Sequence, residues 1–109
     1  MKVVKKSWGK EFWMINNDKY CFKILICNKD KWSSKGKYHY HKNKDETFLE
    51  VKGVLLLDIE GKITYLREGD TIRIKPNTKH RFKALTDEAS FYEISTHHND
   101  KDSYRTSKL

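Results

Sequence analysis

The sequence predicts an all-β fold in a single domain, and three observations support this prediction. No window of about a dozen residues has apolar residues recurring every three and four positions, so amphipathic helices are not expected. Short runs of apolar, β-branched and aromatic residues fill the chain instead, and turn-forming residues separate them. The length of 109 residues is that of about one small domain. Many short strands joined by tight turns are typical of a sandwich or a barrel.

Nine strands are expected along the chain. Their predicted ranges are 11–15, 19–28, 37–42, 46–52, 54–59, 63–67, 71–75, 80–85 and 90–95. Clusters of Asn, Asp and Gly predict turns at 16–18, 60–62 and 69–70. Residues 98–109 are polar, and we expect them to be loosely ordered. No repeat, linker or domain boundary is visible, so residues 1–109 are treated as one domain.

The strand at 37–42 carries two histidines on one face. Side chains two residues apart in a strand point to the same side, so His39 and His41 share a face while Tyr40 points to the other. Neutral imidazole is the commonest metal ligand in proteins. A third histidine, His80, and a carboxylate, Glu46, would complete a site of three nitrogens and one oxygen.

Glu46 reaches this site only if the chain turns between it and His41. The intervening residues 42–45 are polar and include two turn formers, so they read as a turn. We expect the strand that begins at Glu46 to return antiparallel as the second arm of a hairpin and to end at Gly53.

These residues resemble the two motifs of the cupin superfamily. His39, His41, Glu46 and Gly53 fit the first motif without a gap. The run from Gly69 to His80 matches the second motif in length and in most positions. It departs from that motif at Lys75, where a first proline is common, and at Asn77, where glycine is usual. Asn tolerates a positive φ better than most residues, so the turn can still form.

The resemblance, which covers roughly residues 36–82, implies a cupin-type jelly-roll β-barrel. It also implies that His39, His41, Glu46 and His80 hold one divalent metal ion (Mn, Zn, Ni or Fe) inside the barrel. The alternative is that these histidines fill the barrel without a metal, as in cupins that have lost ligands.

Alternation along the strands suggests which other side chains enter the cavity. Phe48 shares the parity of Glu46, and Phe82 shares that of His80, so both are expected to line the wall and contact the ligand. Glu50 lies too far along its strand to ligate the same ion; we expect it at the barrel mouth or paired with a lysine. On the last strand, Glu93 enters the cavity if Phe91 and Ser95 point inward. Glu93 is therefore the first candidate for a catalytic base, with Glu50 as an alternative.

The same end of the chain supplies a second candidate base. His97 follows the last strand, although two adjacent histidines, His97 and His98, cannot both face one side. The run from Glu93 to His98 and the segment 102–105 resemble the ending of small sugar-active cupins related to mannose-6-phosphate isomerase.

The net charge of +8 is carried mostly by lysine. Basic excess is found in proteins that bind nucleic acid, anionic membranes or phosphorylated ligands. Here the lysines are scattered through turns and outward strand positions, so a solvated surface is the first interpretation and a nucleic-acid partner is not expected. If the charge binds an anionic small molecule, Lys79 and Arg81, which flank His80, are the candidate contacts.

The remaining expectations concern compartment and assembly. No segment approaches the roughly 20 apolar residues that span a bilayer, and the N-terminus has no secretory apolar region. Cys21 and Cys27 lie on one predicted strand, about 20 Å apart, so we expect two reduced thiols in a cytoplasmic protein. The strand at 20–27 is apolar on both faces, which predicts that a partner subunit covers one of them in a homodimer.

Three classes of function remain open, because a fold alone does not fix chemistry. The first is a metal-dependent isomerase or epimerase of a sugar, sugar phosphate or nucleotide sugar. The second is an iron-dependent oxygenase. The third is a non-catalytic module that binds a sugar or another metabolite.

Overall fold

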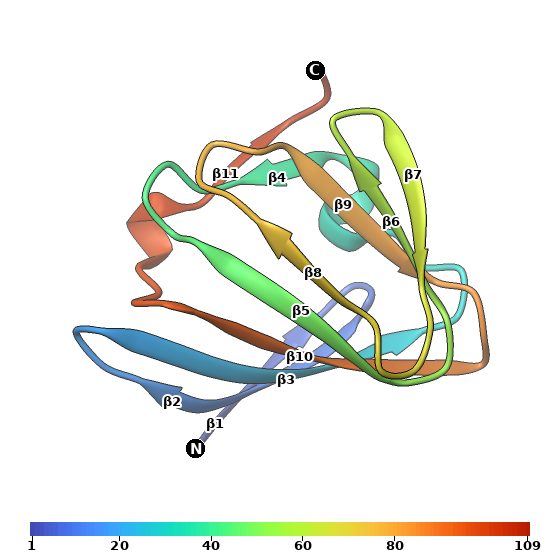
Figure 1. The fold of residues 1–109 in the computed structure, drawn as a ribbon, viewed down its shortest axis with the longest axis horizontal. Helices are drawn as coiled ribbons and strands as arrows, with labels where there is room; N and C mark the ends of the chain where they lie inside the picture. Colours follow the sequence, from blue (N-terminus) through green and yellow to red (C-terminus); the bar gives the residue numbers. More distant parts are fainter.

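Two antiparallel sheets face each other in the computed structural model, which describes all 109 residues (Figure 1). The six-stranded sheet has the order β1-β2-β3-β10-β5-β8, and the five-stranded sheet has the order β11-β4-β9-β6-β7. Consecutive strands alternate between the sheets at several points, which gives the jelly-roll barrel that the motifs imply.

The strands are β1 (Lys2–Lys6), β2 (Gly9–Asn16), β3 (Tyr20–Asn28), β4 (Tyr38–Tyr40), β5 (Glu46–Lys52), β6 (Leu55–Ile59), β7 (Lys62–Leu66), β8 (Thr71–Ile74), β9 (His80–Ala84), β10 (Glu88–Thr96) and β11 (Tyr104–Thr106). Two short 3₁₀ segments, η1 (Ser33–Gly36) and η2 (Asp100–Asp102), complete the structure. No helix is long and apolar enough to cross a membrane.

All nine predicted strands are present, with small differences at their ends. Two strands were missed, β1 at the N-terminus and β11 near the C-terminus. Both lie at a sheet edge and pair with a single neighbour. The expectation of a loosely ordered end was therefore wrong for 100–106, where η2 and β11 form.

The predicted hairpin between the two metal-motif strands is also wrong. β4 belongs to the five-stranded sheet and pairs with β9 and β11, whereas β5 belongs to the six-stranded sheet and pairs with β10 and β8. The turn at 42–45 carries the chain across the barrel from one sheet to the other. Glu46 thus approaches His41 from the opposite wall.

The inner faces of the sheets form a core that is apolar at one end of the barrel and polar at the other. Phe48, Phe82 and Phe91 pack with ring centroids 4.5–6.2 Å apart, and Trp8 meets Phe82 edge-to-face at 5.0 Å. Such aromatic contacts stabilise a core beyond the burial of their area. Beyond Phe48, the interior is lined by histidines, carboxylates and lysines.

The outer face of the six-stranded sheet is unusually apolar. One row of directly opposed residues crosses five strands, and it consists of Val3, Phe12, Ile24, Tyr92 and Leu49. These side chains are half-buried or exposed, whereas their neighbours in β3, β5 and β10 are buried. Five of the six strands therefore present apolar surface to the outside, while β8 places Thr71 and Arg73 on this face.

Both cysteines lie on β3, as predicted. Cys21 and Cys27 are buried and free, with no disulfide between them. Burial raises the pKa of each thiol above its usual range, so both are held in the protonated form.

Candidate functional site

A cavity of about 280 Å³ opens into the polar end of the barrel. His39, Glu46 and His80 line it on one side, and Glu93 and Lys44 line it on another. The aromatic side chains of Trp8, Phe48 and Phe82 form its apolar wall. The cavity thus combines an aromatic wall with closely spaced polar groups.

The three motif histidines come together in this cavity. The ring centroids of His39 and His41 lie 4.4 Å apart, as expected for residues on one face, and the His80 ring lies 5.3 Å from that of His39. His39 and His80 are directly opposed on β4 and β9. Glu46 reaches in from the facing sheet, with its Oε2 atom 3.4 Å from His41 Nε2 and 3.9 Å from His80 Nε2.

Backbone carbonyl groups fix the orientation of two of these rings. His41 Nδ1 donates to the carbonyl oxygen of Asp102 at 2.7 Å, and His80 Nδ1 donates to that of Thr78 at 3.0 Å. A carbonyl oxygen can only accept, so the proton of each ring is on Nδ1 and the lone pair is on Nε2. Both lone pairs are directed toward Glu46.

Burial sets the charge state of the four residues. It lowers the pKa of all three histidines, to about 4 for His41, and keeps the imidazoles neutral at pH 7. Burial also raises the pKa of Glu46, and the nearby charge of Glu93 raises it further. Neutral imidazoles are the form that binds a metal.

No group of three or more His, Cys, Asp or Glu side chains is arranged to hold a metal ion as the side chains stand. The Nε2 atom of His39 lies 3.0 Å from the hydroxyl of Ser103. The chemistry of the donor set nevertheless fits a divalent ion: His41 Nε2 is buried without any hydrogen-bond partner, and it faces the carboxylate of Glu46. In metal-binding histidines, the ring nitrogen that does not bind the metal typically donates a hydrogen bond to a carbonyl or carboxylate group, as Nδ1 of His41 and His80 does here.

A buried network of charges forms the other side of the cavity. The Lys44 ammonium lies 2.7 Å from Glu93 and 3.1 Å from His98 Nδ1, and Lys23 lies 3.9 Å from Glu93 and 3.7 Å from Glu11. Burial alone would raise the pKa of Glu93, but Lys44 and Lys23 outweigh it and hold this pKa well below its usual range. Glu93 is therefore an ionised carboxylate at neutral pH.

This network could not be predicted from the sequence. Lys44 lies in a polar turn and Lys23 in an apolar strand, and we expected lysines to face solvent; both are buried instead. His98, which reaches Lys44, is oriented by donating from Nε2 to Asp100 at 2.8 Å. The partners of Lys44 lie 49 and 54 residues further along the chain, and Lys23 pairs with Glu93 on β10 and Glu11 on β2.

The turn that delivers Lys44 is held by Asp102. Its carboxylate accepts from the backbone N–H groups of Lys42, Asn43 and Lys44 at 2.8–3.1 Å. The backbone carbonyl of the same residue accepts from His41. A single residue near the C-terminus thus positions both the histidine strand and the loop that follows it.

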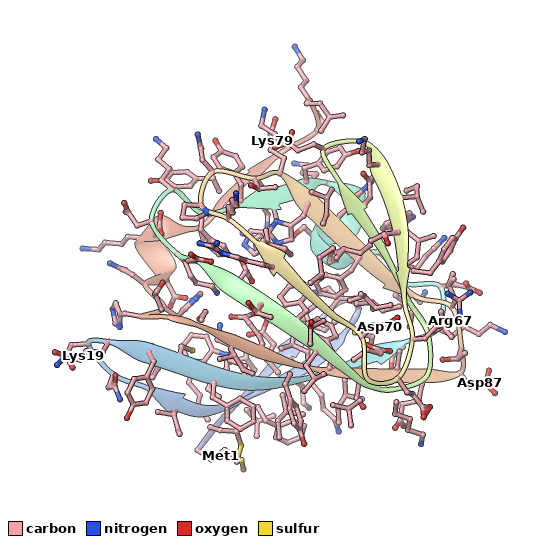
Figure 2. The ribbon with its side chains drawn as sticks, viewed as in Figure 1. Met1, Lys19, Arg67, Asp70, Lys79 and Asp87 are labelled. Carbon is pink, nitrogen blue, oxygen red and sulfur yellow. The ribbon has the colours of Figure 1, made fainter.

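The structure separates the remaining predicted site residues into two groups. Phe48, Phe82 and Glu93 line the cavity. His97 is exposed and donates from Nδ1 to the carbonyl of Asn17 beside a separate surface depression. Lys79 lies at the outer edge of the barrel (Figure 2), and Arg81 is held by Asp58 at 2.9 Å on the outer side of its sheet; neither lines the cavity.

Glu50 does not lie at the barrel mouth and has no lysine partner. It is 1% exposed, and neither carboxylate oxygen has a hydrogen-bond partner. Burial, followed by repulsion from Glu68 and Asp70, raises the pKa of this carboxyl to about 8. Glu50 is therefore protonated at neutral pH, at the end of the barrel remote from the histidines.

A two-sheet jelly-roll barrel in which histidines of one sheet meet a glutamate of the other is the architecture of the cupins, and residues 31–95 match the cupin domain family. The chain belongs to this family. Asn77 takes a positive φ of 64° in the second motif, so asparagine replaces the usual glycine as predicted. No curated protein sequence matches the chain at a significant level.

Several solved structures share the fold at low sequence identity. KdgF from Halomonas sp. superposes with a TM-score of 0.80 at 16% identity, covering 93% of this chain and 92% of its own. A sugar phosphate isomerase from the cupin superfamily, from Silicibacter pomeroyi, gives 0.72 at 17%, covering 92% and 79%. The capsular polysaccharide assembling protein CapF from Staphylococcus aureus gives 0.80 at 18%; the match covers 94% of this chain but 31% of CapF. By name, two of these three proteins are concerned with sugars, the sugar phosphate isomerase and the capsular polysaccharide assembling protein.

Proposed function

We propose that this cupin binds a carbohydrate-type small molecule in the barrel cavity, next to a divalent metal ion held by His39, His41, Glu46 and His80, and acts as an isomerase or epimerase. The observation that carries the proposal is the buried, unpartnered Nε2 atom of His41, which faces Glu46 and His80 inside the cavity. Two structural neighbours, described as a sugar phosphate isomerase and a capsular polysaccharide assembling protein, support the ligand class.

The side chains of the cavity suit a sugar. The aromatic wall of Phe48, Phe82 and Trp8 suits the C–H face of a ring, whereas Glu93 and Lys44 can accept from and donate to hydroxyl groups. Lewis-acid polarisation of adjacent ligand oxygens is what a bound divalent ion would supply. His39 would exchange its contact with Ser103 for that role.

In this proposal Glu93 is the carboxylate that accepts a proton from the ligand. It is the only acidic side chain of β10 that lines the cavity, and it is ionised at neutral pH. His97 is not included, because it lies outside the cavity.

A second candidate is a non-catalytic carbohydrate-binding module. It is favoured by the strong pairing of Glu93 with Lys44 and Lys23, because a carboxylate with so low a pKa is a weak base. The two candidate functions share the ligand and the cavity. They differ only in whether the protein removes a proton from a carbon atom of the bound ligand.

Metal analysis and a ligand screen test both. We expect about one manganese, zinc, nickel or iron ion per chain, a thermal shift with particular sugars, and exchange of a carbon-bound hydrogen in deuterated water. Glu93→Gln should keep the metal and lose the exchange, whereas Glu88→Gln, on the exposed end of the same strand, should keep both. Binding without exchange would select the second candidate, and oxygen consumption on adding ligand to an iron-loaded protein would select an oxygenase instead.

The proposal extends to assembly and compartment. A second copy of the chain would cover the apolar outer face of the six-stranded sheet, and two buried, free thiols are compatible with a reducing cytoplasm.

A further inference from the structure

The lysine and arginine side chains around the cavity fall into two groups. Lys23 and Lys44 are buried, and each lies within 4 Å of a carboxylate. Lys6 and Arg105 also line the cavity, but neither takes part in any of the ion pairs of the molecule. Lys6 and Arg105 are therefore cavity-lining cations without a carboxylate within 4 Å, although the carboxylates of Glu93 and Asp100 line the same cavity.

Both free cations lie at the solvent side of the cavity, on the edge strands of the two sheets. Lys6 is half-buried at the end of β1, and Arg105 is exposed in the middle of β11. Arg105 is directly opposed to His39 across the β4–β11 pair, so the two side chains share the inner face. The guanidinium thus lies one strand away from the histidine cluster.

The Arg105 side chain is held at one point and free at the other. Its Nε atom donates to the hydroxyl of Ser34 at 3.2 Å, and its two terminal nitrogens have no partner. Ser34 has a left-handed backbone, with φ 50°, as does Lys35, with φ 53°. Left-handed non-glycine residues are strained and cluster at sites that clamp ligands.

We infer that Lys6 and Arg105 form a subsite for the anionic group of the ligand. A guanidinium with free terminal nitrogens binds a carboxylate or a phosphate through two parallel hydrogen bonds, and the lysine adds a second charge. The inference rests on the proposed function and narrows it: the ligand is a ring-sized, polyhydroxylated molecule with one carboxylate or phosphate group.

The volume of the cavity sets an upper limit on the size of the ligand that it can enclose. Its volume of about 280 Å³ lies just below the range of about 300–1,000 Å³ usual for ligand pockets. A single ring with its acidic group can be enclosed between the aromatic wall and the rim. A nucleotide sugar would leave most of its length outside.

The experiment compares matched ligands by calorimetry on the metal-loaded protein. Glucose, galactose and mannose are each measured against their uronate and their 6-phosphate. We expect at least one acidic sugar to bind tenfold or more tightly than its neutral parent, and we expect this preference to shrink at 0.5 M NaCl. Whether the uronate or the 6-phosphate binds more tightly identifies the anionic group that the subsite prefers.

Variants assign the preference to the two residues. Arg105→Gln and Lys6→Gln should each reduce the affinity for the acidic sugar about tenfold and leave that for the neutral sugar unchanged. Arg67→Gln and Lys19→Gln remove the same charges from opposite ends of the molecule (Figure 2), away from the cavity, and should have no effect. Equal affinities for acidic and neutral sugars, or equal loss of both in Arg105→Gln, would overturn the subsite alone. Failure of every sugar in the panel to bind would overturn the proposed function and the subsite with it.

Discussion

At the scale of single residues, the metal motif depends on the orientation of imidazole lone pairs. His41 is the clearest case, because its Nδ1 proton is fixed by a carbonyl and its Nε2 atom has no partner. We predict that His41→Ala abolishes metal loading, with at least a 100-fold loss of affinity, and leaves a folded barrel. Metal content by mass spectrometry and the strand signal in circular dichroism measure the two effects. His97→Ala, an exposed histidine outside the cavity, is the control, and metal content unchanged in His41→Ala would contradict the ligand assignment.

Lys44 shows what happens when a buried charge has a specific partner. Removing the ammonium would leave Glu93 buried with only the more distant Lys23 for compensation. We predict that Lys44→Met lowers the free energy of unfolding by about 3 kcal/mol, and that adding Glu93→Gln restores part of it. Urea denaturation of both single variants and the double variant gives the coupling. Lys42→Met, two residues away and exposed, should change stability by less than about 1 kcal/mol.

Glu50 gives a pH dependence of stability with a definite sign. Its pKa is raised from the usual 4.5 to about 8 in the folded state, so the folded chain holds a proton that the unfolded chain has released. The stability due to this proton is fully present below about pH 4.5 and declines as the pH rises to about 8. We predict that Glu50→Gln has little effect at pH 4.5 and stabilises by about 2–4 kcal/mol at pH 8. Thermal denaturation across this pH range measures the difference, with Glu88→Gln as an exposed control; a difference that does not grow with pH would contradict it.

Local spacing predicted the residues of the metal motif but not their environment. His39 and His41 share a face because strand geometry is local, and Asn77 adopts its turn because a positive φ is an intrinsic property of asparagine. Lys44 could not be predicted in the same way. Its turn is polar and reads as solvated, and the carboxylate that makes its burial favourable lies 49 residues later in the chain.

At the scale of elements, contacts between distant parts of the chain also explain why two strands and the crossing at 42–45 were not predicted. β1 and β11 are edge strands of three to five residues, rich in lysine or polar residues, and a partner strand rather than an apolar pattern defines each of them. The turn at 42–45 has a length that suits either a hairpin or a crossing between facing sheets. Only the pairing of β5 with β8 and β10 decides between the two.

The segment after β10 is an element in which fold and site depend on each other. Asp102 closes the 42–44 loop through three backbone hydrogen bonds and orients His41 through its carbonyl. We predict that Asp102→Ala lowers stability by about 2 kcal/mol and metal affinity by about tenfold or more, because the loop and the adjacent histidine loosen together. Asp18→Ala, an exposed carboxylate, is the control. Weaker stability with unchanged metal affinity would mean that the loop does not position the ligands.

At the scale of the whole molecule, the two sheets differ in what they leave uncovered. The inner faces enclose the core and the cavity, whereas the six-stranded sheet presents a continuous apolar row from Val3 to Leu49 on its outer face. Phe22 and Tyr92 extend this surface with an edge-to-face contact at 5.2 Å, and Ile94 beside them is 49% exposed. Contiguous apolar surface of this kind is typical of an interface.

We expect a homodimer through this face, because no other part of the chain covers its apolar row. A standard interface buries about 800 Å² per partner, which is about an eighth of the 6362 Å² that one chain exposes. We predict that the protein sediments as a dimer of twice 13.1 kDa, and that Ile24→Lys, at the centre of the row, shifts it to the monomer because a charge would be buried between the copies. Ile63→Lys, on the exposed edge strand β7 of the other sheet, should leave the dimer intact. A wild-type monomer at about 100 μM, well above the dissociation constant of a stable dimer, would mean that the apolar row serves another contact.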